Sequence, residues 1–170
     1  MPASQRRRDL AIYSTNLDEL TLAGFVLETR ILHSRLHRCL ELEALLRKLA
    51  AHPYKAGSTG IRLAVIIHEG RTPEAIAATE HVLQSLDEEF PEVPVLLADL
   101  PNVFRAGGAL ADVRLAGVCS ATALINAART LMLRKRGPIR AEGPQLASAI
   151  VRPPAQTPVA RMMGLAEKCA

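Results

Sequence analysis

Residues with acid, base and nucleophile chemistry follow three apolar segments of this 170-residue chain. His68 and Glu69 follow the first segment, Asp99 follows the second, and Cys119 and Ser120 follow the third. In parallel α/β sheets, ligands bind where the strands end. If the three segments are neighbouring strands, these side chains converge on one edge of the sheet. We therefore take His68, Glu69, Asp99 and Cys119 as candidate catalytic residues.

The same three turns contain groups suited to binding an anion. Gly70, Thr72 and Ser120 stand where helices begin, and the backbone N–H groups of a helix N-terminus attract phosphate. We take these three as candidate ligand-binding residues. The simpler interpretation, which we favour, is that Thr72 and Ser120 only cap helices and that Asp99 begins a turn.

The segment Gly70-Arg71-Thr72-Pro73-Glu74 resembles the Gly-x-Thr-Pro-Glu turn of phosphosugar isomerase domains. That resemblance implies a sugar phosphate as ligand. It covers only one strand and its turn, and His68 and Glu69 stand where that family has serines. We therefore interpret the shared residues as helix-start chemistry and do not assign the chain to that family.

His33, His37 and Glu41 recur at four-residue intervals. On a helix this spacing stacks three metal-ligating side chains on one face. A fourth ligand is missing from the pattern, because Cys39 would point to another side of the same helix. We therefore predict that the chain holds no metal.

Cys119 precedes a predicted helix, a position that lowers the pKa of a thiol. With His68 or His81 as a base it could act as a nucleophile, although a free cysteine is more often a small buried apolar residue. The glycine-rich segment 106–109 lacks the Lys-Ser/Thr of a phosphate-binding loop. We predict no cofactor.

The formal net charge of +4 is distributed in blocks. Residues 72–104 contain seven acids and no Lys or Arg, whereas the segments on either side are basic. Basic clusters at 6–8 and 134–140 leave nucleic-acid contact open, but we do not favour it because few aromatic residues could stack on bases.

Apolar runs are too short to span a membrane, and no signal peptide follows the basic start of the chain. The three cysteines, an odd number, favour reduced thiols and a cytoplasmic protein.

Two kinds of element should position these residues. Leu17–Ala51 contains no proline and one glycine, Gly24, which predicts one long helix, or two if Gly24 breaks it. Ile61–Ile67 and Val95–Ala98 are apolar runs on either side of a helix that begins at Thr72, so they predict a βαβ unit with parallel strands. A third strand over 113–118 and a helix over 121–136 should follow.

The sequence therefore predicts a single α/β domain over 1–170, a two-layer or three-layer sandwich with a short, mostly parallel sheet and a long N-terminal helix. Its parts are a mainly helical element over 1–56, a βαβα core over 61–137 and a tail over 138–170, with an edge strand at 146–151 and a terminal helix at 159–168. We favour a non-catalytic accessory or assembly subunit that binds other proteins or copies of itself. The alternative is a small-molecule or phosphate-binding enzyme that uses the strand ends.

Overall fold

Five parallel strands form the centre of the protein, in the order β2-β1-β3-β4-β5. The computed structural model describes residues 8–31, 34–54, 60–104, 110–117 and 119–133. Along the chain the elements are β1 (Arg8–Tyr13), α1 (Leu17–Arg30), β2 (Ser34–Cys39), α2 (Leu42–Ala51), β3 (Ile61–His68), α3 (Pro73–Glu89), β4 (Val95–Asp99), β5 (Val113–Ala116) and α4 (Ala121–Leu133).

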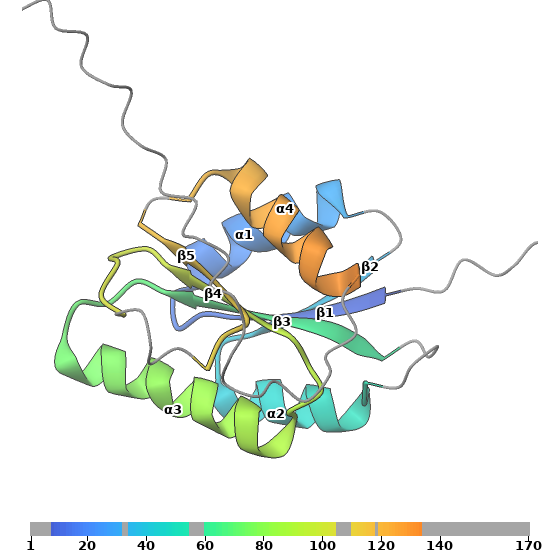
Figure 1. Ribbon diagram of the computed structural model, residues 1–170, viewed down its shortest axis with the longest axis horizontal. Coiled ribbons are helices and arrows are strands. Elements are labelled where there is room, and N and C mark those ends of the chain that lie inside the picture. Colours follow the sequence, from blue (N-terminus) through green and yellow to red (C-terminus); the bar gives the residue numbers. More distant parts are fainter. Residues whose placement is uncertain (1–7, 32–33, 55–59, 105–109, 118, 134–170) are drawn as a thin grey trace, which may run out of the picture.

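Helices cover both faces of the sheet, which gives three layers (Figure 1). Helices α1 and α4 lie on one face, and α2 and α3 lie on the other. Leu63 and Val65 of β3 belong to the core beneath α1 and α4, whereas Ala64 and Ile66 belong to the core beneath α2 and α3. Because both faces are covered, the strand is apolar almost throughout, as buried parallel strands are.

The predicted βαβ unit is confirmed. Strands β3 and β4 pair in parallel, with Ala64 opposite Val95. The Thr72 side chain accepts a hydrogen bond from the backbone N–H of Ala75, and Pro73 occupies the first turn of α3. The third predicted strand is β5, and the Ser120 hydroxyl accepts from the N–H of Ala123 at the start of α4.

The prediction of one long N-terminal helix is wrong. Residues 17–51 form two helices, and strand β2 lies between them on the edge of the sheet. Gly24 does not divide the segment, because it is buried inside α1, where an added Cβ would lie 2.6 Å from Nε of Arg38. The predicted element over 1–56 therefore supplies two of the five strands in addition to two helices.

Pairing with β1 explains why Ser34–Cys39 is a strand. Leu36 pairs with Leu10, and Cys39 pairs with Tyr13. Intrinsic helix preferences are small per residue, so the backbone hydrogen bonds and burial gained by adding a strand override them.

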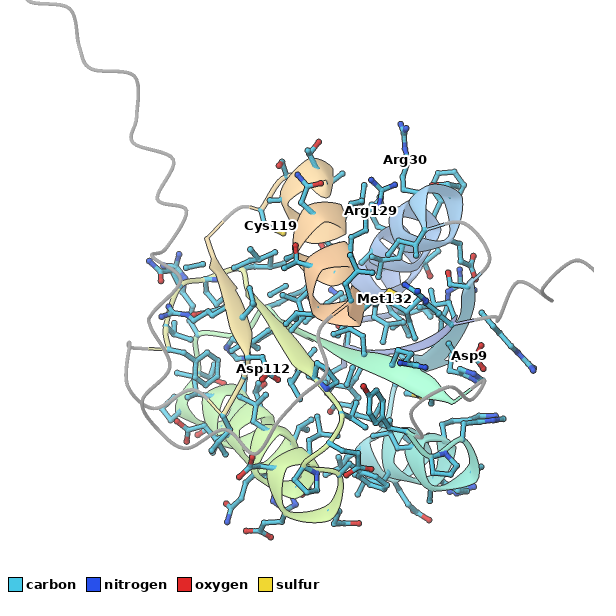
Figure 2. The ribbon with its side chains drawn as sticks, turned by 45° about the vertical axis from the view of Figure 1, so that its right-hand side comes forward. Asp9, Arg30, Asp112, Cys119, Arg129 and Met132 are labelled. Atoms are coloured by element: carbon cyan, nitrogen blue, oxygen red, sulfur yellow. The ribbon has the colours of Figure 1, made fainter. Side chains whose placement is uncertain are left out.

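Helices α1 and α4 are joined at one end. The guanidinium of Arg129 donates a hydrogen bond of 2.7 Å to the carbonyl oxygen of Arg30, the last residue of α1. Figure 2 shows Arg129 beside the end of α1. The negative end of the helix dipole stabilises a cation at this position.

The tail elements predicted at 146–151 and 159–168 and the end of the last predicted helix lie outside the described residues, as do the basic residues 134–140. Among the described helices, none has the length and apolar character needed to cross a membrane.

Candidate functional site

The carboxyl ends of β1 and β3 meet at the point where the order of the sheet reverses. From β1 the chain continues to one edge strand, β2, and then returns to add β3 on the other side of β1. In open α/β sheets with this order, the crevice at the reversal is where ligands bind. The candidate site is therefore at the ends of these two strands.

A side-chain hydrogen bond spans this point. Nδ2 of Asn16, just after β1, donates to Oε2 of Glu69, just after β3, at 2.7 Å. Asn16 also caps α1, because its Oδ1 accepts from the backbone N–H of Asp18. The buried hydroxyl of Ser14 accepts from the N–H of Asn16 and so fixes the turn between β1 and α1.

Asp99, at the end of β4, has a fully buried side chain that is already bonded. Its carboxylate accepts from the backbone N–H groups of Val103 at 3.1 Å and Phe104 at 3.0 Å. It also pairs with the guanidinium of Arg114 on β5 at 2.7 Å. Arg114 in turn donates to the side chain of Asn102. Asp99 thus joins β4, the loop after it and β5.

His68, the last residue of β3, is only 3% exposed and lies opposite Asp99 in the parallel register. Its Nδ1 is 2.8 Å from the hydroxyl of Thr79 on α3, and its ring meets the ring of Phe104 edge-on. Nε2 makes no hydrogen bond within the described part of the chain. Burial lowers the pKa of His68, although the backbone of Gly70 and the Asp99 carboxylate oppose that shift.

The candidate nucleophile, Cys119, does not join this group. It packs against the core beneath α1 and α4, whereas Phe104, the ring partner of His68, belongs to the core on the other face. Burial raises the pKa of the Cys119 thiol, opposite to the lowering expected at a helix N-terminus. The cost of desolvating the thiolate outweighs a backbone hydrogen bond that by itself would lower this pKa. Ser120 caps α4 beside it.

Gly70 and Thr72 shape the turn between β3 and α3. A Cβ added to Gly70 would lie 2.3 Å from Cβ of Ala75, so the glycine lets the turn pack closely on the first turn of α3. Thr72 caps that helix. Of the predicted site residues, the structure therefore brings together His68 with Asp99 along one edge, with Glu69 beside them.

The candidate metal ladder has no geometric basis, because His37 and Glu41 do not share a helix. His37 lies in β2 and Glu41 precedes α2, whereas His33 lies outside the described residues. His37 instead contacts Asp9, with Nε2 and Oδ2 3.2 Å apart, and its ring lies 4.9 Å from the ring of His52. No group of three metal-ligating side chains occurs within the described residues.

Sequence reasoning missed Asn16 and Arg114 as partners in the site. Asn16 carried a visible signal, since a polar run, Ser14-Thr15-Asn16, follows an apolar strand. No feature of the sequence indicated Arg114, because its pairing with Asp99 depends on β5 lying beside β4.

No protein-family model and no curated protein matches the sequence. Solved structures do match. A signal receiver domain of an HD domain-containing protein from Pseudomonas fluorescens Pf-5 has a TM-score of 0.59 at 13% identity, covering 78% of this chain and 91% of that one. A CheY-like response regulator receiver domain protein from Methanospirillum hungatei JF-1 has a TM-score of 0.53 at 11% identity, covering 74% and 93%.

NtrX from Brucella abortus, solved in complex with ATP, has a TM-score of 0.56 at 16% identity. The match covers 73% of this chain but only 26% of NtrX, so it involves one part of a longer protein. The protein therefore has the flavodoxin-like α/β fold, and it shares that fold with response-regulator receiver domains. At these identities the likeness establishes the fold alone.

Proposed function

We propose that this chain is a non-catalytic contact domain that works by binding other proteins or copies of itself. The observation that carries this proposal is the bonding of Asp99. Its buried carboxylate already accepts from two backbone N–H groups and from Arg114, so it serves to hold β4, its loop and β5 together. A general acid or base must instead reach a substrate proton.

The similar solved structures support a role as a module. One is described as the signal receiver domain of a protein that also contains an HD domain, and another is a quarter of a longer chain. We extend this arrangement to the present chain and propose a protein partner. We also propose a cytoplasmic location, which the free thiols of Cys39 and Cys119 support.

The test uses two variants that remove ionisation but keep hydrogen bonding. Glu69→Gln preserves a partner for Asn16, and His68→Gln preserves a partner for Thr79. We expect both variants to rescue the phenotype of cells that lack the protein as well as the wild type does. Circular dichroism checks that each variant is folded. Loss of rescue by a folded Glu69→Gln variant overturns the proposal.

A small-molecule or phosphate-binding enzyme is the second candidate, and the contact between Asn16 and Glu69 favours it. These two polar side chains lie at the topological reversal, where ligands of such sheets bind, and α1 begins beside them. Titration with inorganic phosphate, followed by backbone amide shifts in NMR, tests this candidate. Saturable shifts centred on Asn16 and Glu69 and lost in Asn16→Ala favour it over the contact domain.

A further inference from the structure

Four exposed arginines lie at the edge of the sheet where the strands begin. Arg8 is the first residue of β1, Arg35 is the second residue of β2, and Arg30 is the last residue of α1. Arg129 lies one turn before the end of α4 and donates to the carbonyl oxygen of Arg30 at 2.7 Å. We call Arg8, Arg30, Arg35 and Arg129 the basic edge.

The topology brings these four residues together. Each helix that follows a strand of this parallel sheet runs back toward the edge where the strands begin, so α1 and α4 both end there. Strands β1 and β2 are neighbours, and Asp9 lies opposite Arg35 in their register. Figure 1 shows the start of β1 and the ends of α1 and α4 on its right-hand side, and Figure 2 labels Arg30, Arg129 and Asp9 along that side.

The two basic clusters of the sequence are attached to the fold at this edge. Arg6 and Arg7 directly precede Arg8, and the segment 134–136, Arg-Lys-Arg, directly follows the last residue of α4. These clusters are far apart in the sequence, so only the fold connects both of them to one edge. Together with the basic edge they amount to nine cations, eight of which are arginines.

The acids near the basic edge are already engaged or lie apart from it. Asp9 is buried and contacts His37, with Oδ2 and Nε2 3.2 Å apart, and Glu28 pairs with Arg38 at 2.8 Å. The acids at the end of α3 lie on the other face of the sheet from α1 and α4. Asp112 precedes β5, at the opposite end of the sheet from β2. These acids therefore leave the positive charge of the basic edge in place.

The side chains of the basic edge have the chemistry of a phosphate-binding surface. The guanidinium groups of Arg8, Arg30 and Arg35 form no ion pair with another described residue. Like charges gathered on a surface attract anions. Arginine in particular donates two parallel hydrogen bonds to a phosphate, which lysine cannot do. The excess of arginine over lysine therefore favours a partner that carries phosphate groups.

The number of cations favours a nucleic-acid duplex over an acidic protein. A duplex carries one phosphate charge per about 1.7 Å of its axis, so it meets many cations at once. The acidic block of a second copy, residues 72–104, contains only seven acids, and one of these, Asp99, is fully buried. No aromatic residue belongs to the basic edge, so single-stranded bases have nothing there on which to stack. A duplex presents its phosphates without requiring such contacts.

We propose that the basic edge binds the phosphate backbone of a nucleic-acid duplex without reading its sequence. The four guanidinium groups contact phosphates, and the cations at 6–7 and 134–136 add to the attraction. This binding goes beyond the proposed contact function, which concerns protein partners and does not depend on it.

Fluorescence anisotropy of labelled duplexes, titrated with the full chain, tests the binding. We expect two duplexes of unrelated sequence to bind with equal affinity. The logarithm of the association constant should fall linearly with the logarithm of the salt concentration, with a slope of about −3.6 or steeper for four or more neutralised phosphates. Duplex DNA and duplex RNA of the same length are titrated side by side, and the tighter of the two identifies the source of the phosphates.

Charge-removing variants test whether the basic edge is the surface. Arg8→Gln, Arg30→Gln and Arg35→Gln combined should weaken binding about tenfold or more at about 0.1 M salt and make the salt slope shallower by about three. The matched pair is Arg30→Gln and Arg71→Gln, which each remove one exposed charge. Arg71 follows β3 at the opposite edge of the sheet, so Arg71→Gln should bind as the wild type does.

Three results overturn the inference. One is the absence of duplex binding by the wild type at low salt, including the case in which it binds only phosphatidylcholine vesicles that contain phosphatidylserine. The second is a triple variant that is folded by circular dichroism and binds as the wild type does. The third is an equal loss in Arg30→Gln and Arg71→Gln, since only net charge would then matter. None of these results decides the proposed function, which the Glu69→Gln and His68→Gln variants test separately.

Discussion

His68 is a buried imidazole whose neutral form is favoured by the fold. Burial lowers its pKa below the ordinary value of 6.5, so at acid pH the unfolded chain binds a proton more readily than the folded one does. The stability that His68 contributes is therefore present above pH 6.5 and is lost as the pH falls through its folded pKa. We expect the free energy of unfolding in urea to decrease over that range.

The control for this prediction is His68→Gln, which does not titrate but can still hydrogen-bond to Thr79. Its free energy of unfolding should depend less steeply on pH below 6.5 than that of the wild type. Identical slopes in the two proteins would mean that His68 does not carry the acid sensitivity.

At the residue scale the sequence located the right positions without assigning their roles. It placed His68, Glu69 and Asp99 at strand ends, where the structure has them. A buried aspartate that holds a loop and one that transfers protons look alike in sequence. The difference lies in Arg114, which is distant along the chain and reaches Asp99 only because β5 pairs with β4.

At the scale of elements, the turn from β3 into α3 depends on close packing between two small residues. Gly70→Ala would place its Cβ 2.3 Å from that of Ala75, so the backbone must shift. We expect Gly70→Ala to cost about 1–3 kcal/mol in chemical denaturation, as overpacking does.

Ala75→Gly supplies the matched test, because it removes the opposing methyl group. The double variant should be more stable than the sum of the two single effects implies, by about 0.5 kcal/mol or more, since residues in contact couple. Simple additivity in this double-mutant cycle would contradict the packing explanation.

Helix starts were predictable because their signals are local, whereas strand β2 was not. The residue types of Thr72, Pro73 and Ser120 predict the starts of α3 and α4, because they cap a helix or fit its first turn. Ser34–Cys39 has no such signal, because its neighbours in sequence are good helix formers and its partner strand, β1, lies far earlier in the chain. The predicted helix over 17–51 failed for that reason.

At the scale of the whole molecule, two cores share one sheet. Leu10 of β1 is fully buried beneath α1 and α4, and Leu45 of α2 is fully buried on the opposite side. We expect Leu10→Ala and Leu45→Ala each to cost about 2–5 kcal/mol. Both should shift one common calorimetric transition, because the strands between the cores belong to both.

A double Leu10→Ala, Leu45→Ala variant should show nearly additive losses, since the two side chains lie on opposite faces of the sheet. Separate unfolding transitions in either single variant would show instead that the two layers fold independently.

The sequence by itself determined the α/β class, the parallel βαβ unit and the caps of α3 and α4, because apolar runs and capping residues act over short distances. Only the tertiary structure decided that residues 34–39 join the sheet, that Asp99 is held by Arg114 and that Cys119 packs against the core on the other face of the sheet from Phe104, the ring partner of His68. It also decided which apolar side chains stay uncovered: Leu22 and Phe25 are exposed because the other side of α1 packs on the sheet. These outcomes depend on which distant segments pack together, and that is settled by the balance of burial and hydrogen bonding over the whole chain.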